Sequence, residues 1–319
     1  MRALITGGHG FVGRHLAAHL VACGDDVAVT YLTTDTDQSN KVTLPRTVQS
    51  LALDVTSAKA VSDLIAVAQP DTIFHLAGST FVPEAEKNPR ASFDVNTFGT
   101  INVLDAVRAH APEARVLVVS SAEVYGDPRP GTLPLNEQAP LRPVSTYGVT
   151  KAAADLMGHT YNFRHNVRAI RVRPFSHTGP GQHERFALSS FAKQVAMIKL
   201  GKAEPVIKVG NLEAKRDYSD VSDIVRGYRE ALLNGKEGEV YNLCSGQSRP
   251  MSEYLSMLVA LAGIEVEIKE DPERVRPVEI PDLCGSYERA QKDFGWRPRV
   301  ELEACLGSLL AYWIETVGK

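Results

Sequence analysis

The sequence has few cysteines, no excess of basic residues and no long apolar run, and each absence narrows what the protein can be. Its four cysteines lack the paired spacing of a zinc or disulfide framework, so we expect no metal site. The 35 lysines and arginines against 38 aspartates and glutamates, a net charge of −3, argue against a nucleic-acid partner. No stretch reaches the roughly 18 apolar residues of a membrane helix, and no secretory signal pattern opens the chain. We therefore expect a cytoplasmic protein without a membrane partner.

The chain does contain short apolar runs, rich in Val, Ile and Leu, that alternate with helix-length periodic segments. The runs are mostly continuous, which is typical of parallel strands covered by helices on both faces. The predicted strands are residues 3–6, 27–31, 48–53, 72–76, 115–120 and 167–173. This alternation predicts an α/β fold with a doubly wound parallel Rossmann sheet.

After Pro174 the pattern changes, which predicts a second, smaller α/β domain. Helices are expected near 185–200, 220–232, 252–262 and 302–316, with a strand at 239–243 that could return to the first sheet. We therefore predict a dinucleotide-binding domain over 1–174, joined by about 216–243, and a substrate-binding domain over 175–319.

A glycine motif follows the first predicted strand and leads into a helix. Residues 7–13 read Gly-Gly-His-Gly-Phe-Val-Gly, a spacing that lets the backbone approach a pyrophosphate at the positive end of the helix. The motif predicts that Gly7, Gly10, Phe11, Val12 and Gly13 bind a dinucleotide.

Further cofactor contacts are expected at the carboxyl ends of the later strands, where parallel sheets bind ligands. The residues concerned are Asp54, Val55, Leu76, Ala77, Gly78, Asn96 and Ser120. Asp54 could instead cap the helix that follows it, and we assign no catalytic role to His75.

The second strand ends at Tyr31, where an acidic residue usually binds the ribose of NAD. Since no carboxylate stands there to repel a 2′-phosphate, and Arg14 is close in sequence to the glycine motif, both NADPH and NADH stay open as cofactors.

Tyr147 and Lys151 lie four residues apart at the start of a predicted helix, so both side chains should share one face. A nearby ammonium favours the phenolate and should lower the tyrosine pKa towards the neutral range. Ser120 and Ser121 end the preceding strand, where a hydroxyl could orient the same substrate oxygen. The combination predicts proton exchange with a bound substrate.

Together these motifs resemble the extended short-chain dehydrogenases that act on nucleotide sugars. The resemblance runs from the first strand nearly to the last helix and rests on the glycine motif, Asp54, HLAG at 75–78, Asn96, SSAEVYG at 120–126 and YGVTK at 147–151. It implies a nicotinamide cofactor, a sugar diphosphate held by the C-terminal domain, and a homodimer formed through two helices of each subunit.

Downstream segments are similar to those of GDP-4-keto-6-deoxymannose reductases. They are RPFSHTGPGQ at 173–182, VPEA at 82–85, RDYSDV at 216–221 and YNLCSGQ at 241–247. This likeness implies a GDP-linked sugar as substrate, with contacts from Thr80, Val82, Ser176, Lys193, Arg216 and Arg276.

Three of these substrate contacts have alternatives. Arg216 could pair with a neighbouring aspartate, and Arg276 could be a solvated loop residue. Lys193 could face the base or solvent. Ser176 stands where the family has asparagine, which leaves its phosphate contact open.

The favoured reaction is reduction of the C4 ketone of a GDP-4-keto-6-deoxyhexose, as from GDP-4-keto-6-deoxy-D-mannose to GDP-D-rhamnose. Tyr147 would donate the proton, Lys151 would anchor the nicotinamide ribose, and Ser121 would hold the carbonyl oxygen. The retained Glu123 keeps a GDP-mannose 4,6-dehydratase open as an alternative, although Ala122 replaces the acidic partner found in many dehydratases. A nucleotide-sugar 4-epimerase is the other alternative. Intact Tyr147 and Lys151 argue against a non-catalytic dinucleotide sensor.

Overall fold

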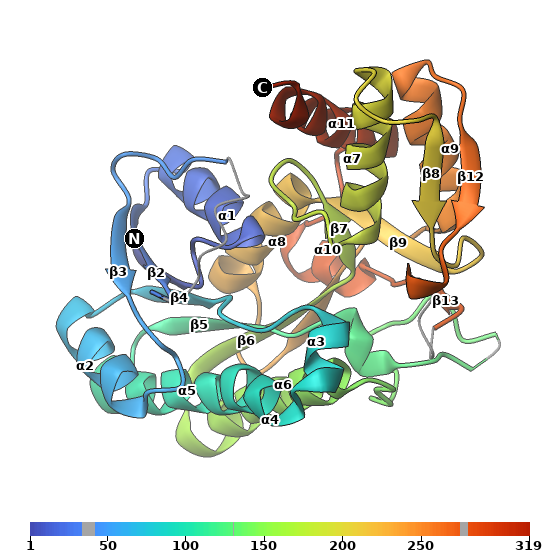
Figure 1. The fold of residues 1–319 in the computed structure, drawn as a ribbon. Helices are drawn as coiled ribbons and strands as arrows, with labels where there is room; N and C mark the ends of the chain where they lie inside the picture. Colours follow the sequence, from blue (N-terminus) through green and yellow to red (C-terminus); the bar gives the residue numbers. More distant parts are fainter. Residues whose placement is uncertain (34–41, 130, 275–279) are drawn as a thin grey trace.

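A seven-stranded parallel sheet forms the centre of the larger part of the protein (Figure 1). The computed structural model describes residues 1–33, 42–129, 131–274 and 280–319. In spatial order the strands are β10 (Val240–Leu243), β6 (Arg168–Pro174), β5 (Arg115–Val119), β4 (Thr72–His75), β1 (Arg2–Thr6), β2 (Asp26–Tyr31) and β3 (Gln49–Ala52). The predicted doubly wound α/β sheet is confirmed.

Helices cover both faces of this sheet, which explains why its strands are apolar on both sides. One face packs against α1 (Phe11–Ala22), α8 (Val221–Asn234) and α10 (Glu288–Phe294). The other face packs against α2 (Ala58–Ala68), α5 (Gly99–His110) and α6 (Thr146–His165). Two separate apolar cores therefore lie above and below the sheet.

The chain reverses its direction of travel across the sheet between β1 and β4. It runs outward from β1 to β2 and β3, then returns to β4 and continues to β5 and β6. Thr6 pairs with His75, so the carboxyl ends of β1 and β4 lie side by side. This is the switch point at which open α/β sheets bind their ligands.

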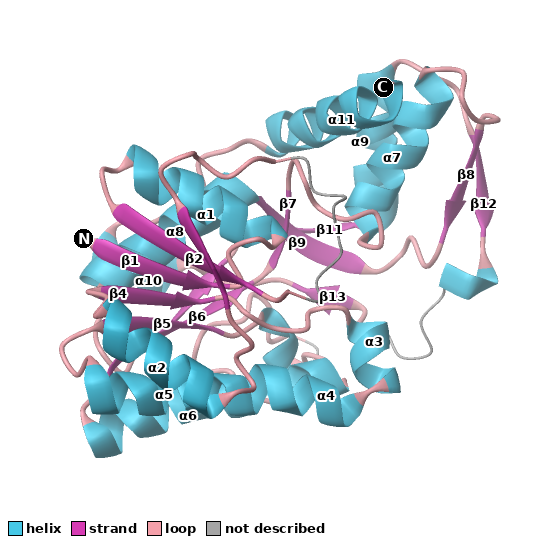
Figure 2. Cartoon of the chain, turned by 60° about the vertical axis from the view of Figure 1, so that its left-hand side comes forward, coloured by secondary structure: helices cyan, strands magenta, loops and turns pink. Residues whose placement is uncertain are grey.

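Smaller sheets and three helices form the rest of the protein, away from the main sheet in Figure 2. β7 (Ser176–Thr178), β11 (Ser248–Pro250) and β13 (Asp282–Leu283) all pair with β9 (Lys215–Asp220), while β8 (Val206–Val209) pairs with β12 (Glu267–Glu270). A third core joins α7 (Ala187–Lys199), α9 (Met251–Ala262) and α11 (Leu302–Gly318). The remaining short helices are α3 (Val82–Lys87), α4 (Pro89–Phe93), η1 (Asp94–Phe98), η2 (Ala122–Tyr125) and η3 (Pro272–Arg274).

The C-terminal half returns to the main sheet where the sequence indicated. β10 pairs in parallel with β6, and α8 packs on the sheet, whereas β9 just before them belongs to the smaller sheet. The domain boundaries at 174 and 216–243 stay a prediction.

None of the helices in the described residues has the length and apolar character to cross a membrane. In the same residues, no three His, Cys, Asp or Glu side chains lie together as metal ligands would.

Candidate active site

The glycine motif forms a tight turn between β1 and α1. Gly7 has a φ of +70°, and a Cβ on it would lie 2.8 Å from the backbone nitrogen of Ala77. A Cβ on Gly13 would lie only 2.6 Å from the carbonyl oxygen of Gly7. A side chain at either position would therefore clash with backbone atoms, and the turn would have to change its conformation to admit it.

The start of α1 suits an anion. The first turn of α1, which the structure describes in full, carries no acidic residue. Its N-cap residue, Gly10, has no side chain that could accept from the backbone N–H groups of that turn. These N–H groups and the helix dipole favour a phosphate at this end. The turn therefore fits the pyrophosphate of a dinucleotide. Phe11 and Val12 pack partly against the core beneath the turn.

Gly78, Asn96 and Lys151 converge next to this turn. A Cβ on Gly78 would lie 2.9 Å from Asn96 Oδ1 and 3.4 Å from Lys151 Nζ. Asn96 Oδ1 accepts from the backbone N–H of Ser79 at 2.8 Å, and its Nδ2 donates to Thr150 Oγ1 at 2.9 Å. The loop after β4 is thus hydrogen-bonded, through Asn96, to the helix that carries Tyr147 and Lys151.

Tyr147 is 8% exposed, and the neighbouring Ser121 hydroxyl lowers the pKa of its phenol less than burial raises it. Burial, with a smaller effect of the Glu123 charge, raises the pKa of Tyr147 to about 12. The expected lowering by Lys151 is therefore wrong for the protein alone. Lys151 Nζ donates instead to the carbonyl of Val119 at 2.9 Å, and its own burial lowers its pKa to about 8.

Ser120, beside this pair, is buried, and its hydroxyl donates to the carbonyl of Lys151 at 3.3 Å. Ser120 therefore links the end of β5 to α6.

The other predicted cofactor residues occupy the same edge of the sheet. Asp54 accepts from the N–H and hydroxyl of Thr56, while Ser57 is the N-cap of α2, so the capping alternative for Asp54 is wrong. Val55 is buried against Gly99, and the N–H groups of Leu76 and Ala77 donate to Thr6.

At the end of β2, the Tyr31 ring stacks on His9 with centroids 4.7 Å apart. The Arg14 guanidinium lies on the same side of the glycine turn and donates to the carbonyls of His9 at 2.8 Å and Val42 at 3.0 Å. A flat aromatic surface and a cation thus lie together beside the glycine turn.

His75 is a hydrogen-bonded core histidine. The Thr100 hydroxyl donates its proton to the Asn96 carbonyl, so the Thr100 oxygen must accept from His75 Nε2. Because Nε2 carries the proton, His75 Nδ1 accepts from the Thr6 hydroxyl at 2.8 Å. Complete burial lowers the pKa of His75 from 6.5 to about 3.

This pKa predicts an acid sensitivity that a substitution should reduce. Below pH 6.5 the unfolded chain binds a proton at His75 that the folded protein refuses, so stability falls as the pH drops towards 3. Between pH 7 and 4.5, protonation of this one residue in the unfolded chain should lower the free energy of unfolding by about 2.5 kcal/mol. Urea unfolding at both pH values should show a smaller loss in His75→Gln than in the parent; equal losses would contradict the assignment.

Four of the predicted substrate residues lie on, or just before, β7, α3 and α7. Ser176 begins β7, Val82 begins α3, and Thr80 is exposed just before it. Lys193 pairs with Glu184 and lies over the ring of Trp313 at 5.6 Å.

Arg216, on β9, donates to the carbonyl of Ile280 at 2.7 Å. The adjacent Asp217 carboxylate accepts from the N–H groups of Ser245, Gly246 and Gly285, and so joins β9 to the loops after β10 and β13. Arg276 lies outside the described residues.

One aromatic cluster was missed by sequence reasoning. The rings of Phe81 and Phe186 meet edge to face with centroids 6.1 Å apart, and the Arg185 guanidinium lies 5.1 Å from the Phe81 ring. The cluster joins the start of α3 to the start of α7. Phe81 lies between two residues predicted to contact the substrate, Thr80 and Val82. Its position in the sequence could therefore have indicated that it belongs to the same region.

Comparison with known proteins gives the following matches. Residues 4–308 match the model of a family described as GDP-mannose 4,6 dehydratase. The chain is 34% identical over 312 residues to a GDP-6-deoxy-D-mannose reductase of Pseudomonas aeruginosa, covering 98% of this chain and 97% of that one.

Two solved structures are similar over almost the whole length. RMD from Pseudomonas aeruginosa, complexed with NADPH, has a TM-score of 0.84 at 31% identity and covers 99% of each chain. Thermus thermophilus UDP-glucose 4-epimerase, complexed with NAD, has a TM-score of 0.88 at 25% identity and covers 98% of this chain and 99% of that one.

Proposed function

Because this chain belongs to the GDP-mannose 4,6 dehydratase family, we propose that it is an NAD(P)H-dependent nucleotide-sugar 4-ketoreductase. Its substrate would be a GDP-4-keto-6-deoxyhexose, with GDP-4-keto-6-deoxy-D-mannose reduced to GDP-D-rhamnose. The observation that carries the proposal is the buried Tyr147 phenol beside Ser121, on the helix whose Lys151 lies next to Gly78 and Asn96.

A bound nicotinamide would supply the hydride for the ketone. Tyr147, which stays protonated at neutral pH because burial raises its pKa to about 12, would donate the proton to the new alkoxide. Ser121 would orient the carbonyl oxygen, and Lys151, near Gly78 and Asn96, would bind the nicotinamide ribose. The protein's contribution is then positioning and a proton held at one oxygen.

The residues around Glu123 favour reduction over dehydration. A 4,6-dehydratase needs an acid and a base that act together to expel the C6 hydroxyl as water. Here Glu123 follows Ala122, a buried methyl group without acid–base chemistry. Retention of Glu123 keeps the dehydratase as the second candidate.

Two parallel assays test the reductase against the dehydratase. The purified protein is mixed with GDP-mannose alone, and separately with a pre-formed GDP-4-keto-6-deoxymannose plus NADPH, while absorbance of the reduced cofactor and ketone content are followed. We expect cofactor oxidation only with the keto sugar. Ketone formation from GDP-mannose without added cofactor would instead support the dehydratase.

NADPH is the proposed coenzyme, because no carboxylate closes β2 and the guanidinium of Arg14 lies beside the glycine turn. The match to an NADPH-complexed relative supports this choice. Fluorescence titration should give tighter binding for NADPH than for NADH.

The proposed substrate contacts are Thr80, Val82, Ser176, Lys193, Arg216 and Arg276. Guanidinium groups pair with two phosphate oxygens at once, which is the reason for assigning the diphosphate to Arg216 and Arg276.

A homodimer through α5 and α6 is also proposed. Val149, Leu156 and Phe163 are spaced seven residues apart on α6 and are 41%, 52% and 81% exposed, so they form one apolar stripe. α5 lies alongside α6 on the same face of the sheet (Figure 1).

The stripe predicts that Leu156→Asp converts the dimer to a monomer, since the interface would have to bury a charge. Light scattering coupled to size exclusion measures the change. Val67→Asp is the matched control, because Val67 is 85% exposed on α2, outside the stripe, and should leave the dimer intact. A monomeric parent protein would overturn the proposed dimer.

A further inference from the structure

Arg173 lies beneath the candidate active site and has no role in the reaction proposed above. It stands on β6 and is 4% exposed. Its Nε donates to Asp155 Oδ2 at 2.7 Å and its Nη2 to Asp155 Oδ1 at 3.2 Å. Asp155, fully buried on α6, follows Lys151 by four residues and Tyr147 by eight, so these three side chains share one side of the helix.

The same guanidinium also binds the segment that follows β5. Arg173 Nη1 donates to the phenol oxygen of Tyr125 at 3.0 Å, and the cation lies 5.1 Å from the centre of that ring. Tyr125 ends η2, the short helix that Ser121 caps and that contains Glu123. One side chain thus contacts both pieces of backbone that carry the proposed catalytic groups.

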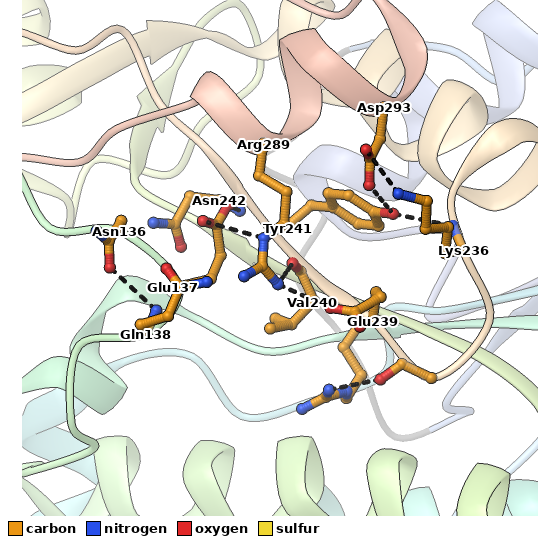
Figure 3. Close-up of polar contacts among 12 residues, drawn as sticks. Asn136, Glu137, Gln138, Lys236, Glu239, Val240, Tyr241, Asn242, Arg289 and Asp293 are labelled. Atoms are coloured by element: carbon orange, nitrogen blue, oxygen red, sulfur yellow. Dashed lines mark hydrogen bonds and ion pairs between the residues drawn. The ribbon is translucent and has the colours of Figure 1, made fainter.

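The network also contacts β10, around which Figure 3 shows Asn242, Glu137 and Arg289. The Tyr125 hydroxyl donates to Asn242 Oδ1 at 2.7 Å. The Glu137 carboxylate accepts from the backbone N–H of Asn242 at 2.8 Å and lies 3.6 Å from Arg289 Nε. Buried polar groups that are all paired favour one conformation, because any displacement would leave a buried charge or hydrogen-bond donor without a partner, at a large cost in free energy.

We propose that Arg173 and Tyr125 are positioning residues, which set the place of the Ser121 segment relative to Tyr147 on α6. The kinetic part of this proposal rests on the reductase function proposed above. A planar guanidinium can bind Asp155 with one edge and Tyr125 with another, and a lysine cannot do both. Loss of either contact would let Ser121 and Tyr147 move apart, and small displacements of catalytic groups reduce turnover strongly.

Tyr125→Phe tests the link, with Tyr241→Phe as its matched control. Tyr241, on the neighbouring β10, is also fully buried, and its hydroxyl contacts Asp293 at 3.0 Å and the N–H of Lys236 at 2.9 Å (Figure 3). Each variant removes one hydroxyl and two hydrogen bonds, so both should lower Tm to a similar extent.

Only Tyr125→Phe should also lower kcat, by about tenfold, with KM for NADPH and for the keto sugar changed less than about twofold. If the two variants had equal kcat, the role of Tyr125 would be purely structural and the proposal overturned.

Hydrogen exchange tests the same link without turnover. In Arg173→Lys, amides of residues 121–126 and 146–151 should exchange faster than in the parent protein, while Tyr241→Phe leaves both segments unchanged. Unchanged exchange in Arg173→Lys would overturn the proposal. A parent protein that reduces no keto sugar would sink the reductase function, and the exchange result would still decide the positioning role.

Discussion

Tyr147→Phe is expected to reduce kcat by about 1000-fold, because a positioned general acid contributes on the order of 10²–10⁴ to a rate. Removing one oxygen leaves the ring to fill its place in a site where Tyr147 is only 8% exposed. The glycine turn is untouched, so the Kd for NADPH should change less than about twofold. Steady-state kinetics with the keto sugar and fluorescence titration of NADPH measure the two quantities.

Tyr161→Phe is the control, since Tyr161 lies on the same helix and, at 7% exposed, is as buried as Tyr147. Its kcat should stay near that of the parent. Turnover that survives within a few-fold in Tyr147→Phe would remove this residue from the reaction.

Gly13→Ala is expected to abolish dinucleotide binding, a loss of at least about 100-fold in affinity, since backbone must move to admit the new methyl group. The added Cβ would lie 2.6 Å from the Gly7 carbonyl oxygen and 2.6 Å from the Gly8 Cα. Moving either atom would open the turn that presents the N–H groups of α1 to the pyrophosphate. Fluorescence titration with NADPH measures the effect.

Gly307→Ala provides a matched control, because Gly307 lies within α11 and a Cβ there would meet nothing within 4 Å. It should leave binding unchanged and slightly favour the helix. Full NADPH affinity in a folded Gly13→Ala protein would place the dinucleotide somewhere else.

The parts of the fold that could be predicted from sequence are those set by local pattern. The apolar runs at 3–6 and 115–120 became β1 and β5, since continuous Val, Ile and Leu over that length suit strands buried on both faces. The glycine turn was predictable for the same reason, because its steric requirement involves residues only a few positions apart.

The local environment of Tyr147, the proposed proton donor, could not be predicted in this way. The four-residue spacing placed Tyr147 and Lys151 on one face, but the pKa of Tyr147 depends on burial by distant segments. Burial raises the pKa of Tyr147, and the Lys151 ammonium does not reverse this because it donates to the Val119 carbonyl. Spacing along a helix indicates which side chains share a face, and gives no measure of how much water reaches them.

Long-range contacts were likewise missed. Arg173 meets Tyr125 across 48 positions of the chain, and Phe81 meets Phe186 across more than twice that separation. Nothing in the local sequence around either pair marks its partner, because such contacts depend on the tertiary arrangement of β6, η2, α3 and α7. In the sequence, Arg173 is only the first residue of the segment RPFSHTGPGQ. Its contacts with Asp155 and Tyr125 are visible only in the structure.

Transfer of a labelled hydrogen tests the central claim most directly. The keto sugar is incubated with NADPH that carries deuterium at the transferable position of the nicotinamide, and the product is examined by mass spectrometry and NMR. The account predicts one deuterium at sugar C4 for each NADPH oxidised, and about 1000-fold less labelled product from Tyr147→Phe over the same time. A reduced sugar without deuterium at C4, or cofactor left unconsumed while product forms, would contradict it.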